Sequence, residues 1–337
     1  MKKIYLILSV FALVFTACET DFEVNAEWEE TTVVFGLLDK AKEIQFVKIN
    51  KAFLGEADAL QMAQHSDLVN FEPFDYNDST GDLQVKLYKI DVNDTIERIL
   101  KDTLLLKDDG LFASDNNIVY YFNTPEGDDF LSKNTTYSLV INNVKTGNIV
   151  SSSTEIIKGF NFEGFDGLSG TQTSYNFSFY NLYDGENKAY YTFEWEPSKT
   201  PNAVIYQFAL RFHYEENEVA KELLWTQTEV NEREKILTIY GKDFFSFLEN
   251  NLVKDNAVRE FISIDIEMTL GAQDLKTYIL VNEPITGIVQ ERPQFTNIEN
   301  GIGLFSSRHS KVISNLGLNP ATLEHLKSID GLDRNFQ

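Results

Sequence analysis

The sequence predicts a mostly β protein, because short segments of alternating apolar and polar residues follow one another and are separated by turn residues. The segment Ile205–Tyr214 shows the alternation most clearly: every second residue is Tyr, Phe or Leu, and the residues between are Gln, Ala, Arg and His. Phe261–Leu270 alternates in the same way. A period of two is typical of antiparallel strands with one buried face and one wetter face.

The first predicted body spans residues 31–158 and is an immunoglobulin-like β-sandwich, because about seven short strands in a stretch of this length fit that architecture. The candidate strands are Thr32–Leu38, Ile44–Asn50, Leu83–Ile90, Ile96–Leu106, Ile118–Phe122, Thr136–Asn142 and Ile149–Ile157. Glycines in Asp108–Gly110 and Lys145–Asn148 supply the positive φ that turns between such strands need.

A second antiparallel β body is predicted for residues 173–310, after a glycine-rich linker over residues 159–172. Its candidate strands are Tyr190–Trp195, Ile205–Tyr214, Glu222–Thr228, Lys235–Tyr240, Phe261–Leu270 and Thr277–Val281. Helical spacing of apolar residues predicts a helix over Asp243–Asn251, with Asp243 as its cap. Residues 311–337 are predicted to form a tail with a short helix that begins at Asn319-Pro320 and ends near Lys327. Whether the second body is a sandwich or a barrel stays open.

Composition restricts the classes of partner. The 337 residues include 52 acidic and 29 basic side chains, so the formal net charge is −23. A field of this sign repels nucleic acid and anionic bilayer surfaces, and we expect no nucleic-acid partner. Hydrophobic residues make up 43% of the chain, which is enough for a sizeable core. The single cysteine can form neither an intrachain disulfide nor a multi-cysteine zinc site.

The amino terminus carries the features of an export signal. Two lysines precede the apolar run Ile4–Phe15, which is too short to span a bilayer comfortably and suits the core of a signal peptide. The end of this segment, Phe15–Cys18, resembles a bacterial lipobox, and the only cysteine stands where that motif requires it. The resemblance implies cleavage of residues 1–17 and lipidation of Cys18, whose acyl chains would anchor the protein in the outer membrane. The alternative is an ordinary signal peptide with an incidental cysteine.

Residues 18–30 form an acidic tether in this interpretation. Glu19, Asp21 and Glu23 open a run of like charges, which favours an extended and solvated segment. An acidic stretch directly after the cysteine also resembles the surface-export signal of Bacteroidota lipoproteins. That resemblance implies display at the cell surface, with the periplasmic face of the outer membrane as the alternative location.

The search for catalytic and metal-binding motifs identifies no convergent set of residues. The four histidines lack metal-ligand spacing, and His213 on the polar face of a predicted strand is interpreted as a surface or network histidine. Glu194 and Glu196 would suit a glycosidase only if they converged in a cleft, which Trp195 and Trp225 could line. Asp75–Asp82 has some features of a calcium loop but fits a hairpin loop better. We predict no cofactor, no metal site and no enzymatic activity.

Three triplets are similar to the Bacteroidota O-glycosylation signal, which consists of an acidic residue, a hydroxyl residue and a small or aliphatic one. They are Asp78–Thr80, Asp94–Ile96 and Asp102–Leu104. The similarity implies Ser79, Thr95 and Thr103 as candidate modification sites.

Three features together resemble a family of Bacteroidota outer-membrane lipoproteins that carry a domain of unknown function. An extended strand ending Val34–Leu38 follows the lipobox. Gly110–Phe112, Tyr137–Leu139 and Ser151–Thr154 resemble the closing strands of the family's amino-terminal sandwich. Pro293–Phe305 contains the motif Asn-Ile-x-Asn-Gly-x-Gly-x-Phe. The resemblance implies an accessory protein of the kind found beside TonB-dependent transporters.

The glycines of Asn300–Gly303 predict a tight chain reversal or bulge with close backbone approach. A phosphate-binding loop is disfavoured, because it would need a helix start and usually a lysine.

These observations favour a non-enzymatic lipoprotein that acts as a binding or accessory subunit of an envelope transport complex. Its partners would be the outer membrane, reached through the lipid, and a TonB-dependent transporter or another envelope protein. A structural component of a secretion or gliding assembly and a carbohydrate-active hydrolase stay open as alternatives.

Overall fold

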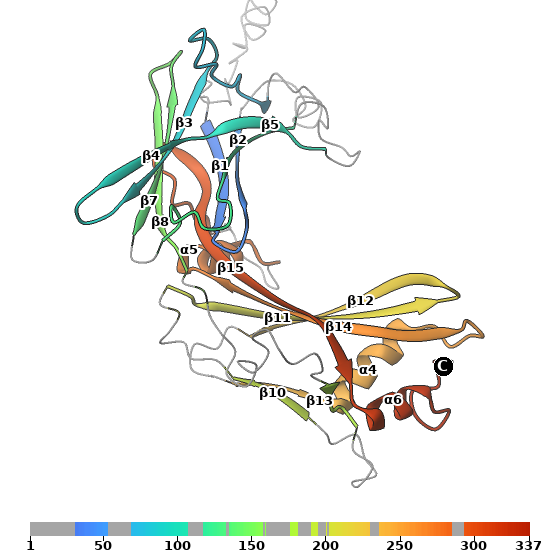
Figure 1. The fold of residues 1–337 in the computed structure, drawn as a ribbon. Helices are drawn as coiled ribbons and strands as arrows, with labels where there is room; N and C mark the ends of the chain where they lie inside the picture. The colour runs from blue at the N-terminus through green and yellow to red at the C-terminus, as the bar shows by residue number, and fades with distance from the viewer. Residues whose placement is uncertain are drawn as a thin grey trace, which may run out of the picture.

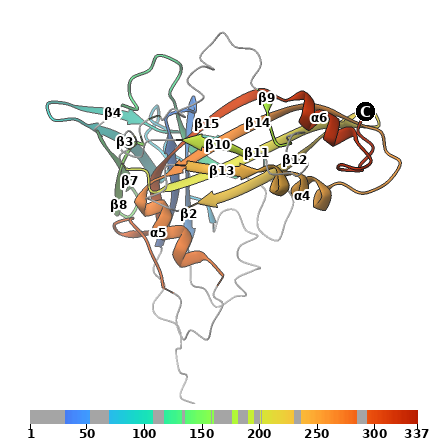
Figure 2. The same ribbon diagram turned by 90° about the horizontal axis from the view of Figure 1, so that it is seen from below.

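The computed structural model describes residues 31–52, 69–106, 117–132, 135–157, 159, 176–180, 190–194, 200, 202–229, 236–284 and 293–337. Within these residues the chain is mostly β, as predicted, and forms two bodies with separate hydrophobic cores (Figures 1 and 2). The helices of this part are α4 (Gly241–Asn251), α5 (Gln273–Asn282) and α6 (Pro320–Lys327). None of the helices in these ranges is long and apolar enough to cross a bilayer.

The first body is the predicted amino-terminal β-sandwich. Strands from two sheets enclose one core, in which Val47, Leu87 and Tyr137 are fully or almost fully buried. One sheet contains, in spatial order, β4 (Thr95–Ile99), β3 (Leu83–Ile90), β7 (Thr136–Asn143) and β8 (Ile149–Glu155). The other contains β15 (Gly301–Leu318), β1 (Thr31–Asp39), β2 (Ile44–Ala52), β6 (Ile118–Asn123) and β5 (Lys101–Leu104).

Tyr137 connects the start of β7 to the chain before it. Its phenol donates a hydrogen bond to the Phe130 carbonyl at 2.6 Å and accepts one from the Ser132 amide at 2.6 Å. A strand tyrosine that bonds back to the backbone a few residues upstream is the tyrosine corner of immunoglobulin-like sandwiches. This contact supports the immunoglobulin-like description of the first body.

The predicted single strand Ile96–Leu106 is two strands in different sheets. Strand β4 pairs with β3 in one sheet, and β5 pairs with β6 in the other. Leu100 lies between them, is buried in the core, and donates its amide to the Val85 carbonyl at 2.9 Å. The prediction of one strand was wrong because the chain crosses from one sheet to the other at Leu100, whose burial in the core depends on contacts with both sheets.

The second body is built on one face of strands β12 (Val219–Glu229), β11 (Ile205–Glu216), β14 (Arg259–Gly271) and the second half of β15. The predicted apolar face of β11 is buried, and Phe212 packs against Phe244 of α4 with ring centroids 6.0 Å apart. Strands β10 (Tyr190–Glu194) and β13 (Ile236–Tyr240) form a separate pair, and β9 (Asn176–Phe177) pairs with β15.

Strand β15 joins the two bodies, because its 18 residues belong to both (Figure 1). Its first part runs parallel to β1, from Gly301 opposite Thr32 to Arg308 opposite Asp39. Its second part runs antiparallel to β14, beginning at Arg308 opposite Gly271. The boundary expected between residues 310 and 311 therefore falls inside a strand, and residues 301–308 complete the sheet of the first body.

Three local predictions are corrected or confirmed by the backbone. Helix α4 begins at Gly241 after Tyr240, so Asp243 lies in the first turn, near the positive end of the helix dipole, and is not the cap. Asn319 caps α6 as predicted, accepting a hydrogen bond from the Thr322 amide at 2.9 Å. A bulge in β14 turns Ile262 outward, whereas the simple alternation predicted it on the buried face.

Candidate functional site

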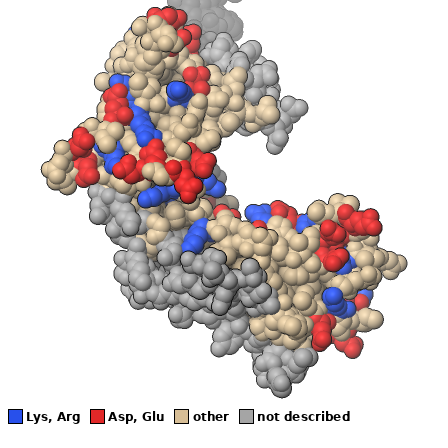
Figure 3. Space-filling model, in the orientation of Figure 1, with Lys and Arg blue, Asp and Glu red and all other residues tan. Residues whose placement is uncertain are grey.

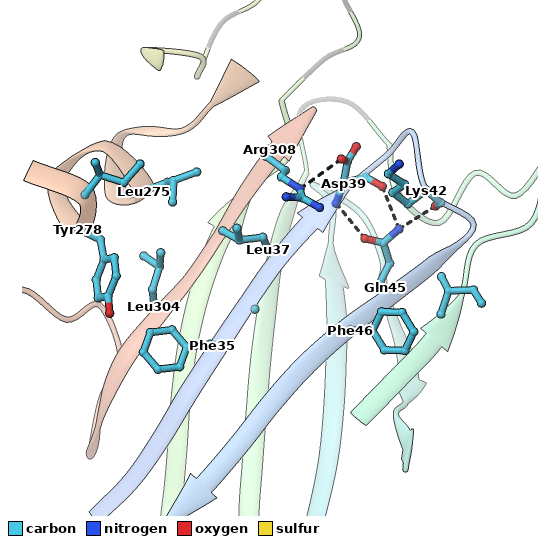
Figure 4. Close-up of a pocket in the computed structure, with 13 residues that line it drawn as sticks. Phe35, Leu37, Asp39, Lys42, Gln45, Phe46, Leu275, Tyr278, Leu304 and Arg308 are labelled. Carbon is cyan, nitrogen blue, oxygen red and sulfur yellow. Dashed lines mark hydrogen bonds and ion pairs between the residues drawn. The ribbon is translucent and has the colours of Figure 1, made fainter. Parts of the chain in front are cut away.

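The candidate site is an apolar groove on the outer face of β1, β2 and β15, with α5 as its wall (Figure 4). The groove has a volume of about 460 Å³. Alternation along β1 creates it: Val34, Gly36 and Leu38 point into the sandwich core, so Phe35 and Leu37 point out into the groove. Leu304 of β15 lies beside Phe35 in register.

Gly36 leaves space within the sheet for a large core side chain beneath the groove. A Cβ atom at Gly36 would lie 3.0 Å from Cδ2 of Phe305, the neighbouring residue on β15. Phe305 is fully buried in the sandwich core. The glycine therefore makes room for the ring that fills the core directly beneath the groove.

Helix α5 contributes Leu275, Tyr278 and Ile279 to the groove. The ring of Tyr278 meets the ring of Phe35 edge-on, with centroids 5.8 Å apart and an angle of 75° between the planes. Residues 277–281 were predicted as a strand, and that prediction was wrong. The run Tyr-Ile-Leu-Val suits a strand by local preference, but this segment packs as a helix over β15, and tertiary contacts override a weak preference.

A second hollow of about 330 Å³ continues the groove on the other side of the Phe35–Tyr278 contact. It is lined by Val33 and Ile302 from the sheet and by Pro293–Thr296. Phe35 and Tyr278 border both hollows. An elongated apolar surface with two aromatic rings at its middle suits contact with an extended or helical apolar segment.

The other end of the groove is polar. Gln45 holds the chain turn there: its amide nitrogen donates to the Asp39 and Lys42 carbonyls at 2.9 and 2.8 Å, and its oxygen accepts from the Asp39 amide at 2.8 Å (Figure 4). Arg308 Nε lies 3.4 Å from Oδ2 of the buried Asp39. The guanidinium is partly exposed, so the groove ends at a cation whose counter-ion lies beneath it.

His309 lies on the other side of Asp39, with its Nδ1 3.9 Å from Oδ1 of the carboxylate. Burial lowers the pKa of His309; the Asp39 carboxylate opposes this effect, and Lys40 and Lys311 add to it. The histidine is therefore neutral at pH 7, and Asp39 is balanced mainly by Arg308.

The motif at residues 297–305 connects the start of β15 to helix α5 and to strand β1. Asn297 donates to the Phe305 carbonyl at 2.7 Å and accepts from its amide at 2.9 Å. Its side chain also donates to Asp274 of α5 at 2.8 Å, which ties the wall of the groove to the sheet. Gly303 has a φ of 119°, and a Cβ there would lie 2.0 Å from the Val34 carbonyl. The predicted close backbone approach at these glycines is confirmed, but Gly301–Gly303 lie in a strand that pairs with β1 in unbroken register and form neither a chain reversal nor a bulge.

The candidate residues named from sequence do not gather at this groove. Cys18, Glu19, Asp21, Glu23, Trp195 and the linker residues 160–172 lie outside the described residues. Ser79 is exposed at the tip of a loop, Thr95 is exposed at the start of β4, and Thr103 is half-buried on β5.

Two other sequence interpretations concern motifs that the structure describes. His213 lies 3.1 Å from Asp265, which confirms a network histidine. Residues 75–82 form a loop closed by the Asp75 amide donating to the Thr80 carbonyl at 2.7 Å, which confirms the hairpin. In the described part of the chain, no group of three or more His, Cys, Asp or Glu side chains is arranged to hold a metal ion.

Sequence reasoning missed the groove residues Phe35, Phe46 and Tyr278. For Phe35 and Phe46 the available signal was a large aromatic at an outward position of a strand whose alternate residues are buried; Tyr278 gave no such signal, because it lies on helix α5. Trp225, which we considered as a cleft residue, stacks on Phe247 of α4 at 5.4 Å. That contact makes it part of the packing around the second core.

Comparison with known proteins adds little. No family model matches the chain, and no curated protein matches it. A solved cytokine receptor complex (crystal form 1A) is similar to it with a TM-score of 0.23 and 10% identity, over 86% of this chain and 98% of that one. The chicken CNTN1 FN1–FN3 domains give a TM-score of 0.22 and 9% identity, over 86% of this chain and 67% of theirs. At these TM-scores the similarity carries no argument about function.

Proposed function

We propose that this protein is a non-enzymatic, lipid-anchored outer-membrane protein, displayed at the cell surface, that binds an envelope transport complex as an accessory subunit. The observation that carries the proposal is the apolar groove around Phe35 and Tyr278. The Phe35 side chain is 41% exposed although it stands in the middle of a strand, and the exposed Ile44 and Phe46 continue the apolar surface on β2. Clustered apolar residues of this kind mark interaction surfaces.

The position of the groove relative to the anchor supports a membrane-embedded partner. Strand β1 carries Phe35 and is the first described strand after the predicted lipidated Cys18. The segment between Cys18 and Thr31 can span at most about 45 Å when fully extended. A groove held within that distance of the bilayer suits the exposed part of a transporter.

The charge of the protein supports a protein partner. Its formal net charge of −23 disfavours nucleic acid and anionic lipid surfaces. Acidic and basic side chains lie intermixed over the first body (Figure 3), for example in the Lys86–Glu97 pair at 3.1 Å. The TonB-dependent transporter implied by the family resemblance is the partner class that we propose.

A photo-crosslinking amino acid in place of Phe35 tests the docking site in intact cells. We expect a covalent adduct with an outer-membrane transport protein. The control is the same substitution at Val253, an exposed apolar residue of the second body, which should give no such adduct. Equal adducts at both positions, or none at Phe35, would contradict the proposed groove.

The anchor is tested separately. We expect Cys18→Ser to release the protein from the outer-membrane fraction and to abolish incorporation of labelled palmitate. Retention of the variant in that fraction would count against the lipid anchor, whatever the result at Phe35.

A further inference from the structure

A further cavity, which shares no lining residue with the groove, lies in the first body where the loop at residues 72–77 meets β5 and β6. It has a volume of about 810 Å³. Leu83 and Leu100 are buried residues of its lining, and Tyr120 and Tyr121 of β6 border it. A cavity of this size lies in the range of sites that hold small organic ligands.

The loop at residues 72–77, which forms one wall of the cavity, has a constrained conformation. Phe74 and Tyr76 pack edge to face with ring centroids 5.0 Å apart. The loop that carries them is closed by the hydrogen bond from the Asp75 amide to the Thr80 carbonyl. At its end Gly81 has a φ of 104°, and a Cβ there would lie 2.1 Å from the Pro73 carbonyl. The two rings are therefore presented by a tightly constrained turn, which lowers the cost of ordering a binding site.

The hydroxyl of Tyr120 is the unexplained group in this cavity. Tyr120 is only 2% exposed, and its hydroxyl has no hydrogen-bond partner in the part of the chain that the structure describes. A buried hydroxyl without a partner is unfavourable, because it has given up its hydrogen bonds to water and gained none in the protein. Burial, and then the nearby Asp102 carboxylate, raise the pKa of Tyr120, so the phenol keeps its proton and can donate to a ligand oxygen.

The remaining polar groups of the lining are mostly acceptors of hydrogen bonds. Glu72, Asp75 and Asp102 supply carboxylates, and Asn77 supplies an amide. These acidic groups, on a protein of net charge −23, repel an anionic ligand. Lys145 lies 3.6 Å from Glu72 and also pairs with Asp82, while Lys101 lines the cavity beside Asp102. These lysines offset part of the acidic charge, and the remaining carboxylate and amide oxygens can accept hydrogen bonds from the hydroxyls of a neutral ligand.

We propose that this cavity binds a neutral saccharide. Sugar rings present apolar C–H faces to aromatic side chains such as Tyr76, and they present hydroxyls to carboxylates, amides and phenols at their edges. Tyr120 would gain its missing hydrogen bond from one of these hydroxyls. The inference goes beyond the proposed function, because it concerns a different cavity and does not require the groove at Phe35.

The test is calorimetric titration of the full chain with neutral oligosaccharides: maltohexaose, cellohexaose, laminarihexaose, xylohexaose and mannohexaose. At least one should bind. Tyr120→Phe should weaken that binding by about tenfold, the loss expected for one buried hydrogen bond. The same variant should leave the free energy of unfolding unchanged or higher, because it removes a hydroxyl that has no partner among the residues the structure describes. Saccharide binding should thus weaken while the free energy of unfolding does not fall, whereas a variant that damaged the fold would lower both.

Two further variants complete the design. Tyr76→Ala should weaken saccharide binding by removing the aromatic wall, and Tyr278→Phe, the same chemical change as Tyr120→Phe but in the other groove, should leave it unaltered. The proposal is overturned if none of the oligosaccharides binds, or if Tyr120→Phe and Tyr76→Ala bind as the parent does. Binding of hexalysine with no binding of saccharides would also overturn it, by assigning the cavity to a cationic ligand.

Discussion

Arg259 is the side chain whose loss should destabilise the second body most. It is 1% exposed at the first residue of β14, and its Nε donates to Glu216 at 2.8 Å. Its two terminal nitrogens donate to the Asp255 carboxylate and the Arg334 carbonyl, each at 2.9 Å. Its own backbone accepts a hydrogen bond from the Gln337 amide at 2.9 Å. One guanidinium thus connects β11, the loop before β14 and the carboxy-terminal residues.

The substitution Arg259→Met keeps the apolar stem and removes the charge. Removing one partner of a buried ion pair costs about 3–5 kcal/mol, since the other charge stays buried. Glu216 keeps a second partner in Lys221, so we expect the lower end, about 3 kcal/mol. Urea denaturation followed by circular dichroism measures the loss. Hydrogen exchange should show the largest loss of protection at Arg259 and Gln337.

The double variant Arg259→Met/Glu216→Gln is the control. It removes the partly buried Glu216 carboxylate together with its partner and should recover part of the lost free energy of unfolding. A loss below about 1 kcal/mol for Arg259→Met would refute the reasoning, because that value is typical of an exposed pair.

Two further predictions concern β15. Gly303→Ala should destabilise the first body by about 3 kcal/mol or more, because the new Cβ would lie 2.0 Å from the Val34 carbonyl at a φ of 119°. Gly147→Ala, also at positive φ but with open space around it, should cost only about 1 kcal/mol in the same urea titration. A similar cost at both glycines would contradict the close approach of β1 and β15. Because burial holds the pKa of His309 below 6.5, the unfolded chain takes up a proton at this residue before the folded chain does. The contribution of His309 to stability should therefore be complete above pH 6.5 and decline as the pH falls below it, and His309→Gln should remove that part of the pH dependence; an unaltered pH profile would contradict this.

Local periodicity was sufficient to predict strands that alternate over a whole segment. In β11 every second residue from Tyr206 to Tyr214 faces the core as predicted, because a period of two places all the large apolar side chains of this strand on one face. The same argument failed at Ile262, where one extra residue in β14 shifts the register and brings Phe261 onto the core side. A bulge inserts a single residue without a distinct composition, so periodicity does not reveal it.

The 18-residue strand β15 was not predicted, although its first glycines were recognised as a site of close backbone approach. Its first part alternates poorly because Leu304, Phe305 and Ser306 are all buried, by α5 on one side and by the sandwich core on the other. A strand covered on both faces loses the periodic signal. The groove was missed because it exists only where α5 covers part of that sheet, and residues 277–281 of α5 were predicted as a strand.

The sequence by itself determined the β class, the amino-terminal sandwich, most strand positions and the cap of α6, because these depend on side chains within a few residues of one another. Only the tertiary structure decided that β15 belongs to both bodies, that residues 273–282 form a helix, and that Phe35 borders a groove while Tyr120 borders a cavity. Each of these depends on contacts between segments far apart in the chain, such as Phe35 with Tyr278, and no local pattern specifies which distant segment will supply the partner.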